Sequence, residues 1–241
     1  MSLYIPADIA QVIQSYMDSD SYINSLRICK SFESGDSDRI YHYRNGGYSL
    51  PEWVTKVVLG EKIEKLKSPQ LVYLDMNHNS NYFSLHNCKN LKVLKLGQST
   101  LTNDCLWDLN LKELYVEENR SLSWYLIKHM TSLKLLDIGK DEDICFRVGP
   151  LESQIETFRF DLMNKASSAV LKDFKMIKHL VLGQNFSLNH IEHLPLESLE
   201  IPNAQVMDGR ICHFPNLKLL ILHHNMSHNI TGHPTMKTIL K

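Results

Sequence analysis

The chain has 241 residues, of which 43% are hydrophobic and 22% charged, so it is long enough and apolar enough to fold around a full core. Its formal net charge of −1 provides no field that would hold a polyanion or an anionic membrane. No apolar stretch reaches the ~20 residues of a membrane span, and no basic flank precedes an apolar run at the start. We therefore expect an intracellular protein, cytoplasmic or nuclear, that binds neither nucleic acid nor membrane.

The first 45 residues do not repeat, and their spacing predicts two short amphipathic helices. Pro6 suits a first helical position, because its missing N–H would have no helical partner there anyway. The first apolar stripe consists of Ile9, Val12, Ile13, Tyr16 and Met17. Residues 18–21, an alternation of Asp and Ser, end this helix and offer caps for the next one. The second stripe consists of Ile23, Leu26 and Cys29.

The segment YIPADIAQVIQSYMDSDSYINSLRICKSF resembles an F-box. Ile5-Pro6 match the opening Leu-Pro of that family with Ile for Leu, and Ile28-Cys29-Lys30 with Phe32 match its close. After Phe32, polar residues and glycines stand where the family forms a third helix. The resemblance implies that these helices bind the Skp-family adaptor of a cullin-RING ubiquitin ligase. The adaptor-binding residues are then expected to be Ile5, Pro6, Ile9, Val12, Ile13, Leu26 and Cys29.

A second interpretation of the same helices is that they only cap the open first edge of a repeat array, as terminal repeats must. Capping explains their amphipathic character but not the Ile-Pro start and the Ile-Cys-Lys-x-Phe close together. Because an amphipathic pair has more than one side, both roles could belong to the same helices.

From residue 54 onward the sequence repeats the pattern L-x-x-L-x-L. Successive copies start 17, 20, 20, 22, 22, 22, 19 and 21 residues apart. The nine copies are Val54/Val57/Leu59, Leu71/Leu74/Met76, Leu91/Leu94/Leu96, Leu111/Leu114/Val116, Leu133/Leu136/Ile138, Ile155/Phe158/Phe160, Ile177/Leu180/Leu182, Leu196/Leu199/Ile201 and Leu217/Leu220/Leu222. A last, incomplete copy is expected at Met236 and Ile239.

The last two apolar residues of each copy are two positions apart, which is the period of a strand with one buried face. One such strand cannot bury its own apolar face, but parallel stacking of neighbours makes a continuous core. Asn79, Asn119, Asn185 and Asn225 stand three residues after the pattern, where a side-chain amide can bond the turn that leaves the sheet. The sequence therefore predicts a stack of short parallel strands.

The pattern, with its following Asn, resembles the leucine-rich repeat, and LGQNF at residues 182–186 is a minor likeness to FNIP-type repeats. The resemblance implies an α/β fold: a curved, right-handed leucine-rich-repeat solenoid with a parallel sheet on its concave side. We expect about nine short repeats in residues 46–241, preceded by a small helical F-box-like domain in residues 1–45. Short helices are expected at residues 121–130 and 167–176, with single turns or irregular chain elsewhere on the convex side.

The residues between the buried ones predict a binding surface on the concave sheet. They mix both charges with aromatic and aliphatic groups, as protein-binding surfaces do. An unidentified protein substrate is the expected partner, and in an F-box protein the repeats would select it. The substrate-binding candidates are Tyr73, Asp75, Lys95, Glu113, Tyr115, Asp137, Arg159 and His179.

The sequence does not predict an enzyme, a cofactor or a metal site. It contains no phosphate-binding glycine loop, no G-x-S-x-G and no H-E-x-x-H motif. The five cysteines lie far apart with no C-x-x-C pair, which favours free buried thiols. His223, His224, His228 and His233 lie close together in the sequence, but their spacing matches no zinc pattern. A metal-binding C-terminus stays open as a third, weaker hypothesis.

Overall fold

The computed structural model describes residues 40–43, 50, 54–59, 66, 68–77, 84–97, 101–116, 122–139, 154–160, 171, 174–183, 191–201, 214–222 and 237–240. The expected N-terminal helices, with all seven adaptor-binding candidates, lie outside these residues. The four asparagines of the turns and the four C-terminal histidines also lie outside them. The domain boundary expected at residues 45–46 falls in a part of the chain that is not described.

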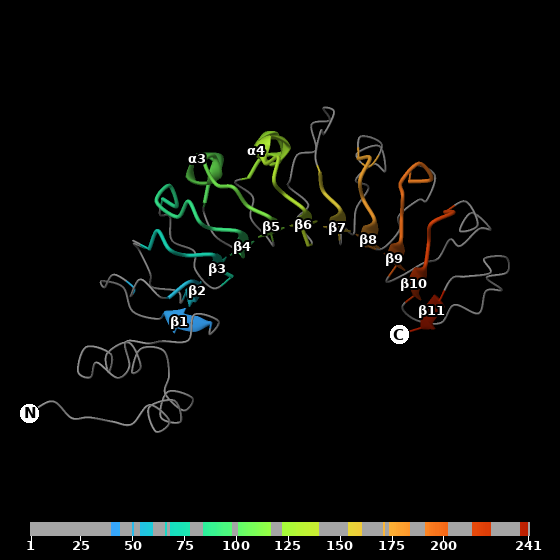
Figure 1. The fold of residues 1–241 in the computed structure, drawn as a ribbon, viewed down its shortest axis with the longest axis horizontal. Coiled ribbons are helices and arrows are strands. Elements are labelled where there is room, and N and C mark those ends of the chain that lie inside the picture. The colour runs from blue at the N-terminus through green and yellow to red at the C-terminus, as the bar shows by residue number, and fades with distance from the viewer. Residues whose placement is uncertain are drawn as a thin grey trace, which may run out of the picture. The chain divides into compact units, whose positions relative to one another are not determined.

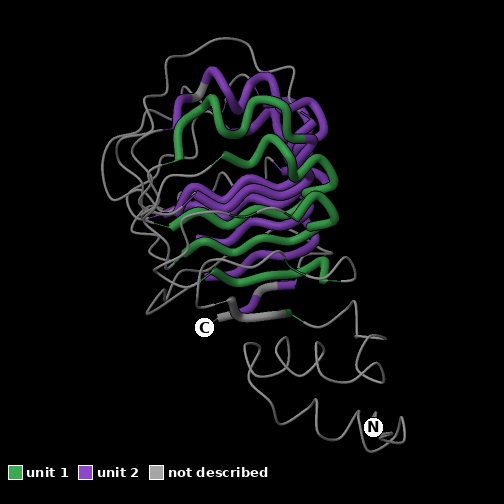
Figure 2. The backbone as a smooth tube through the Cα atoms, turned by 90° about the vertical axis from the view of Figure 1, so that its left-hand side faces the viewer, with its two compact units in different colours: residues 1–109 green, residues 110–241 purple. Residues whose placement is uncertain are grey.

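The chain divides into two compact units, residues 1–109 and 110–241 (Figure 2). Among the described residues of the first unit, four strands pair in chain order and every pair is parallel. They are β1 Tyr41–Tyr43, β2 Lys56–Leu59, β3 Tyr73–Asp75 and β4 Val93–Leu96. The repeat pattern predicted the last three strands but not β1, whose Tyr41 lies beside Val57.

The described part of the second unit contains seven strands, again parallel and in chain order. They are β5 Glu113–Val116, β6 Leu135–Asp137, β7 Thr157–Phe160, β8 His179–Leu182, β9 Ser198–Ile201, β10 Leu219–Leu222 and β11 Lys237–Leu240. Equivalent positions of successive copies lie side by side, as in Leu136 beside Phe158. The structure thus confirms a repeat solenoid built from parallel strands, and β11 confirms the last, incomplete copy.

Backbone hydrogen bonds extend the stacking beyond the strands. The N–H groups of Lys134 and Leu135 both donate to the carbonyl oxygen of Lys112, at 2.8 and 3.0 Å. The same double contact recurs where β7, β8, β9 and β10 begin. Each repeat therefore satisfies the backbone of the next one at the point where the chain enters the sheet.

In each unit the core lies on one face of the strands and continues behind it. In β5, for example, Leu114 and Val116 are buried while Glu113 and Tyr115 are partly exposed. The repeat pattern misses a second set of buried side chains, three and about six residues before several of the described copies. This set includes Leu85, Cys88, Ile127, Met130, Leu171, Phe174 and Phe214. Their carbonyl groups accept turn hydrogen bonds, as when Leu217 N–H donates to Phe214 at 3.1 Å.

Two short helices accompany the described strands, α3 Asn103–Leu106 in the first unit and α4 Trp124–His129 in the second. In the second unit the strands line one side and α4 lies on the other (Figure 1). Helix α4 confirms the helix expected at residues 121–130, although it is shorter. The described part of the other expected helix, residues 171 and 174–176, contains no α-helical residue. Within the described ranges, neither helix has the length and apolar character needed to cross a bilayer.

Two glycines allow the turns after the strands to form. A Cβ atom on Gly97 would overlap the backbone carbonyl of Asn77, so the turn after β4 packs directly against the turn after β3. Gly139 has a φ of 50°, in the left-handed region that glycine enters without steric cost. The two positions therefore favour glycine for different reasons, close backbone approach and backbone conformation.

Candidate protein-interaction face

The side chains that point away from the core form an open face on each unit. The open face of the first unit consists of Lys56, Val58, Tyr73, Asp75, Val93 and Lys95. The open face of the second unit consists of Glu113, Tyr115, Leu135, Asp137, Thr157, Arg159, His179, Val181, Ser198, Glu200, Leu219, Ile221, Lys237 and Ile239. All eight substrate-binding candidates lie on these faces and none is buried. Whether they bind a substrate stays a prediction.

Three of the candidates contact one another on the first unit. The hydroxyl of Tyr73 donates a hydrogen bond to Oδ2 of Asp75 at 3.3 Å, and Nζ of Lys95 lies 5.6 Å from the centroid of the Tyr73 ring. Partial burial, and then the charge of Asp75, raise the pKa of Tyr73. The phenol thus stays protonated as a donor, with a cation over its ring.

Asp75 and Asp137 both cap the turns that follow their strands. Oδ1 of Asp75 accepts a hydrogen bond from Asn77 N–H at 3.0 Å, and Oδ1 of Asp137 accepts one from Gly139 N–H at 2.9 Å. The other oxygen of Asp137 lies 3.8 Å from Nε of Arg159. These carboxylates have structural contacts that the sequence analysis did not assign to them. The sequence signal for these contacts is an Asp at the end of a strand, whose carboxylate can accept a hydrogen bond from the backbone N–H two residues later.

The remaining candidates belong to the second unit. The hydroxyl of Tyr115 donates a hydrogen bond to Oε2 of Glu113 at 3.0 Å, which fixes the ring along β5. The side chain of Arg159 is 56% exposed, against 19% for its partner Asp137. His179 is exposed on the neighbouring strand, where it lies beside Thr157. A basic, hydrogen-bonding region therefore occupies β7 and β8.

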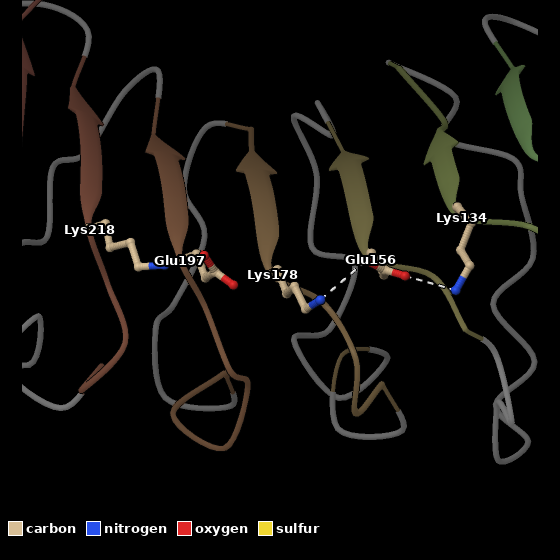
Figure 3. Close-up of polar contacts among 5 residues, drawn as sticks. All are labelled: Lys134, Glu156, Lys178, Glu197 and Lys218. Carbon is tan, nitrogen blue, oxygen red and sulfur yellow. Dashed lines mark hydrogen bonds and ion pairs between the residues drawn. The ribbon is translucent and has the colours of Figure 1, made fainter.

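Five charged residues of alternating sign form a ladder where strands β6 to β10 begin (Figure 3). The charge ladder consists of Lys134, Glu156, Lys178, Glu197 and Lys218. Glu156 accepts hydrogen bonds from Lys134 at 2.8 Å and from Lys178 at 3.3 Å, and Glu197 accepts one from Lys218 at 2.6 Å. The apolar repeat pattern did not predict this ladder, although all five residues stand directly after the first apolar residue of a copy.

The lysines of the charge ladder lower the pKa values of both glutamates. Hydrogen bonds from Lys134 and Lys178 lower the pKa of Glu156, and the hydrogen bond and charge of Lys218 lower that of Glu197. Both carboxylates are therefore ionised at neutral pH and engaged within the protein.

An aliphatic cluster, Leu219, Ile221 and Ile239, occupies β10 and β11. Ile221 lies beside Ile239, and Leu219 lies beside Lys237. The strand pattern places these three aliphatic side chains away from the core, and each of them is partly exposed. Within one sheet, the open face of the second unit thus changes from polar and charged at β5 to β7 to mainly aliphatic at β10 and β11.

No group of three metal-ligating side chains occurs among the described residues. Cys88 and Cys105 are buried free thiols, and burial raises the pKa of Cys88 to about 11. Cys88 is therefore a protonated core side chain at neutral pH, without the thiolate that a nucleophile or metal ligand needs.

No protein-family model matches the sequence, and a search of curated proteins finds no significant match. The class of protein is therefore defined by the architecture alone: a repeat solenoid of short parallel strands with few helices. Its most prominent surface feature is the chemically mixed open face of the second unit.

Proposed function

We propose that the repeats bind a polypeptide on their open faces and that the chain is the substrate-recognition subunit of a cullin-RING ubiquitin ligase. The observation that carries the binding role is the open face of the second unit, which places charged, aromatic and aliphatic groups in register on paired parallel strands. Such mixed surfaces suit protein partners better than small molecules, which bind in concave pockets.

The ligase role is supported by the resemblance of residues 4–32 to an F-box. In that role the N-terminal helices dock apolar side chains on a Skp-family adaptor, while the repeats hold the substrate. Helix-on-helix docking of an amphipathic stripe is a common mode of protein recognition. The ubiquitin would be transferred by the other subunits of the ligase, so this chain needs no catalytic residue.

Co-expression with a recombinant Skp-family adaptor tests the ligase role. We expect the two chains to co-elute in size exclusion, and Ile9→Asp or Val12→Asp to reduce co-elution at least tenfold, because a charge would enter the apolar interface. Tyr125→Ser, on the exposed side of α4, is the control and should leave the complex intact. Circular dichroism of each variant checks that the repeats remain folded.

A second candidate function is that of a repeat scaffold whose N-terminal helices are only a cap. The pairing of β1 with β2 favours it, since the chain just before the first repeat already belongs to the sheet. If the wild-type chain does not bind the adaptor, this function replaces the ligase role. Binding of a polypeptide to the open faces is common to both candidates.

A further inference from the structure

We infer that the open face of the second unit takes an extended polypeptide segment with a defined chemistry: an acidic residue over β7 and β8 and apolar residues over β10 and β11. This inference rests on the proposed function, because it names the partner of the same face. It uses the exposure of the charged groups, the aliphatic cluster and the spacing of the strands, all within one unit.

In the described ion pairs of this unit, the basic side chains are more exposed than the acidic ones. In the pairs of Lys218 with Glu197 and of Arg159 with Asp137 the base is the more exposed partner, at 72% against 34% and at 56% against 19%. Lys134 and Lys178 are likewise more exposed than Glu156. The carboxylates of these four pairs are less exposed and already accept hydrogen bonds from lysines or from a turn amide, so the pairs offer donors to a ligand.

Arg159 is the principal anchor for an acidic group. Its contact with Asp137 runs through Nε at 3.8 Å, which is longer than a hydrogen bond. A guanidinium has five N–H donors and prefers a carboxylate that it can bind with two of them. His179 is exposed on the next strand and can add a further hydrogen bond to the same ligand group.

The aliphatic cluster supplies the second half of the site. Leu219, Ile221 and Ile239 keep part of their surface in water, and covering that surface with an apolar side chain is favourable. Lys237 borders the cluster from β11, where it is exposed and lies beside Leu219. The cluster therefore fits Leu, Ile, Val or Phe side chains with a further acidic group at its edge.

The distance between Arg159 on β7 and the aliphatic cluster on β10 and β11 sets the distance between the ligand residues that contact them. Neighbouring strands lie about 4.8 Å apart and an extended chain advances about 3.3 Å per residue. The three strand steps from β7 to β10 thus correspond to about four or five ligand residues. An acidic residue followed or preceded by an apolar one at that distance would contact both halves at once.

A nucleic acid fits these groups less well than an acidic polypeptide does. Each of the basic groups Lys134, Arg159, Lys178 and Lys218 has a carboxylate beside it, so these described bases form no continuous positive strip for a phosphate backbone. The aliphatic cluster would also stay uncovered. Charge complementarity and the cluster together favour the polypeptide.

Selection of a random dodecapeptide display library on the full chain tests the inference. We expect the enriched peptides to carry Asp or Glu about four or five residues from Leu, Ile, Val or Phe. By fluorescence anisotropy of labelled synthetic peptides, Arg159→Glu should weaken binding at least tenfold. Ile221→Ser and Ile239→Ser should each weaken it severalfold, and circular dichroism of each variant checks that the repeats remain folded.

Matched controls lie outside the open face. Lys175→Glu repeats the charge reversal and Met176→Ser repeats the apolar-to-polar change at two exposed positions between Phe174 and Ile177. Both should leave peptide affinity unchanged. A loss of affinity in either control equal to that in Arg159→Glu would contradict the proposed position of the site.

The outcomes separate this inference from the proposed function. Enriched peptides that depend on open-face residues but are basic or uncharged would overturn the acidic–apolar chemistry and leave polypeptide binding standing. If no enriched peptide depends on any open-face residue, both the acidic–apolar inference and the proposed polypeptide-binding role fail. Binding of a single-stranded RNA that Arg159→Glu abolishes would assign the face to nucleic acid instead. Self-association in sedimentation velocity that Ile221→Ser abolishes would assign it to a second copy of the chain.

Discussion

At the scale of single residues, Ser68 departs from the chemistry of its position. The equivalent position, three residues before the repeat pattern, carries Cys88, Met130, Phe174 and Phe214 in other copies, all buried. Ser68 is fully buried too, and its hydroxyl oxygen has no hydrogen-bond partner among the described residues. A buried hydroxyl without a partner loses its hydrogen bonds to water on folding, so this residue costs stability.

Ser68→Ala should therefore stabilise the protein. Removing a buried hydroxyl that has no partner is expected to raise the free energy of unfolding by about 1 kcal/mol. Urea denaturation followed by circular dichroism measures the change. Ser84→Ala is the control, since Ser84 is exposed and accepts a hydrogen bond from His86 N–H. A stabilising effect of equal size in both variants would contradict the burial argument.

At the scale of the elements, the charge ladder couples neighbouring strands that are about 22 residues apart in sequence. Each carboxylate joins its strand to an adjacent one through lysine, while the backbone satisfies its own hydrogen bonds. Because these side chains are partly exposed, water and salt screen their attraction, and each pair contributes modestly to stability. The ladder thus adds a pH-dependent contribution to the stability of the stacked strands. The main contribution to that stability is apolar burial.

Glu156→Gln should change the acid sensitivity of the protein. The folded-state pKa of Glu156 is lowered from the ordinary value of 4.5, so its contribution is fully present above that value and is lost as the pH falls through the lower folded pKa. We expect the variant to have a lower Tm than the wild type at pH 7, and the difference to shrink at pH 3.

Differential scanning calorimetry at pH 7, 5 and 3 measures this difference in Tm. High salt at pH 7 should reduce it as well, because it screens the pairs with Lys134 and Lys178. A Tm difference that is equally large at pH 3 and pH 7 would show that packing, rather than ionisation, causes the effect.

At the scale of the whole molecule, stability is expected to depend on contacts between successive repeats. In the described part of the second unit, successive strands pair with one another in chain order. The buried side chains follow the same order, so every repeat covers the apolar face of its neighbours. Such solenoids behave as nearly one-dimensional arrays, in which a local change acts first on adjacent repeats.

Leu199→Ala tests this dependence. Leu199 is fully buried on β9, and its truncation should lower the free energy of unfolding by about 2–5 kcal/mol. Hydrogen exchange should show the largest loss of protection in β8, β9 and β10, with a smaller loss in β5 and β6. Ile221→Ala, on the partly exposed open face, should cost less. Equal loss of protection throughout the unit would indicate a single cooperative block.

The alternation of apolar residues was enough to predict the strands, because a period of two and a repeat of about 20 residues are visible along one chain. Pairs such as Leu136 and Phe158 confirm the alignment of the copies. The pattern did not predict β1, whose sequence lacks the repeat, or the buried column at Ser68 and Phe174, which lies in turns of variable length. The F-box-like helices lie outside the described residues and stay a prediction.

By itself, the sequence determined the repeat, the parallel strands and the side of each strand that faces the core, since all three follow from local apolar spacing. Only the tertiary structure decided which polar groups are engaged within the protein. Arg159 became the ion-pair partner of Asp137, and Glu156 a link between Lys134 and Lys178, because stacking brings groups from different repeats to within hydrogen-bonding or ion-pairing distance. The chemistry of the open face depends on that register, which no single repeat contains.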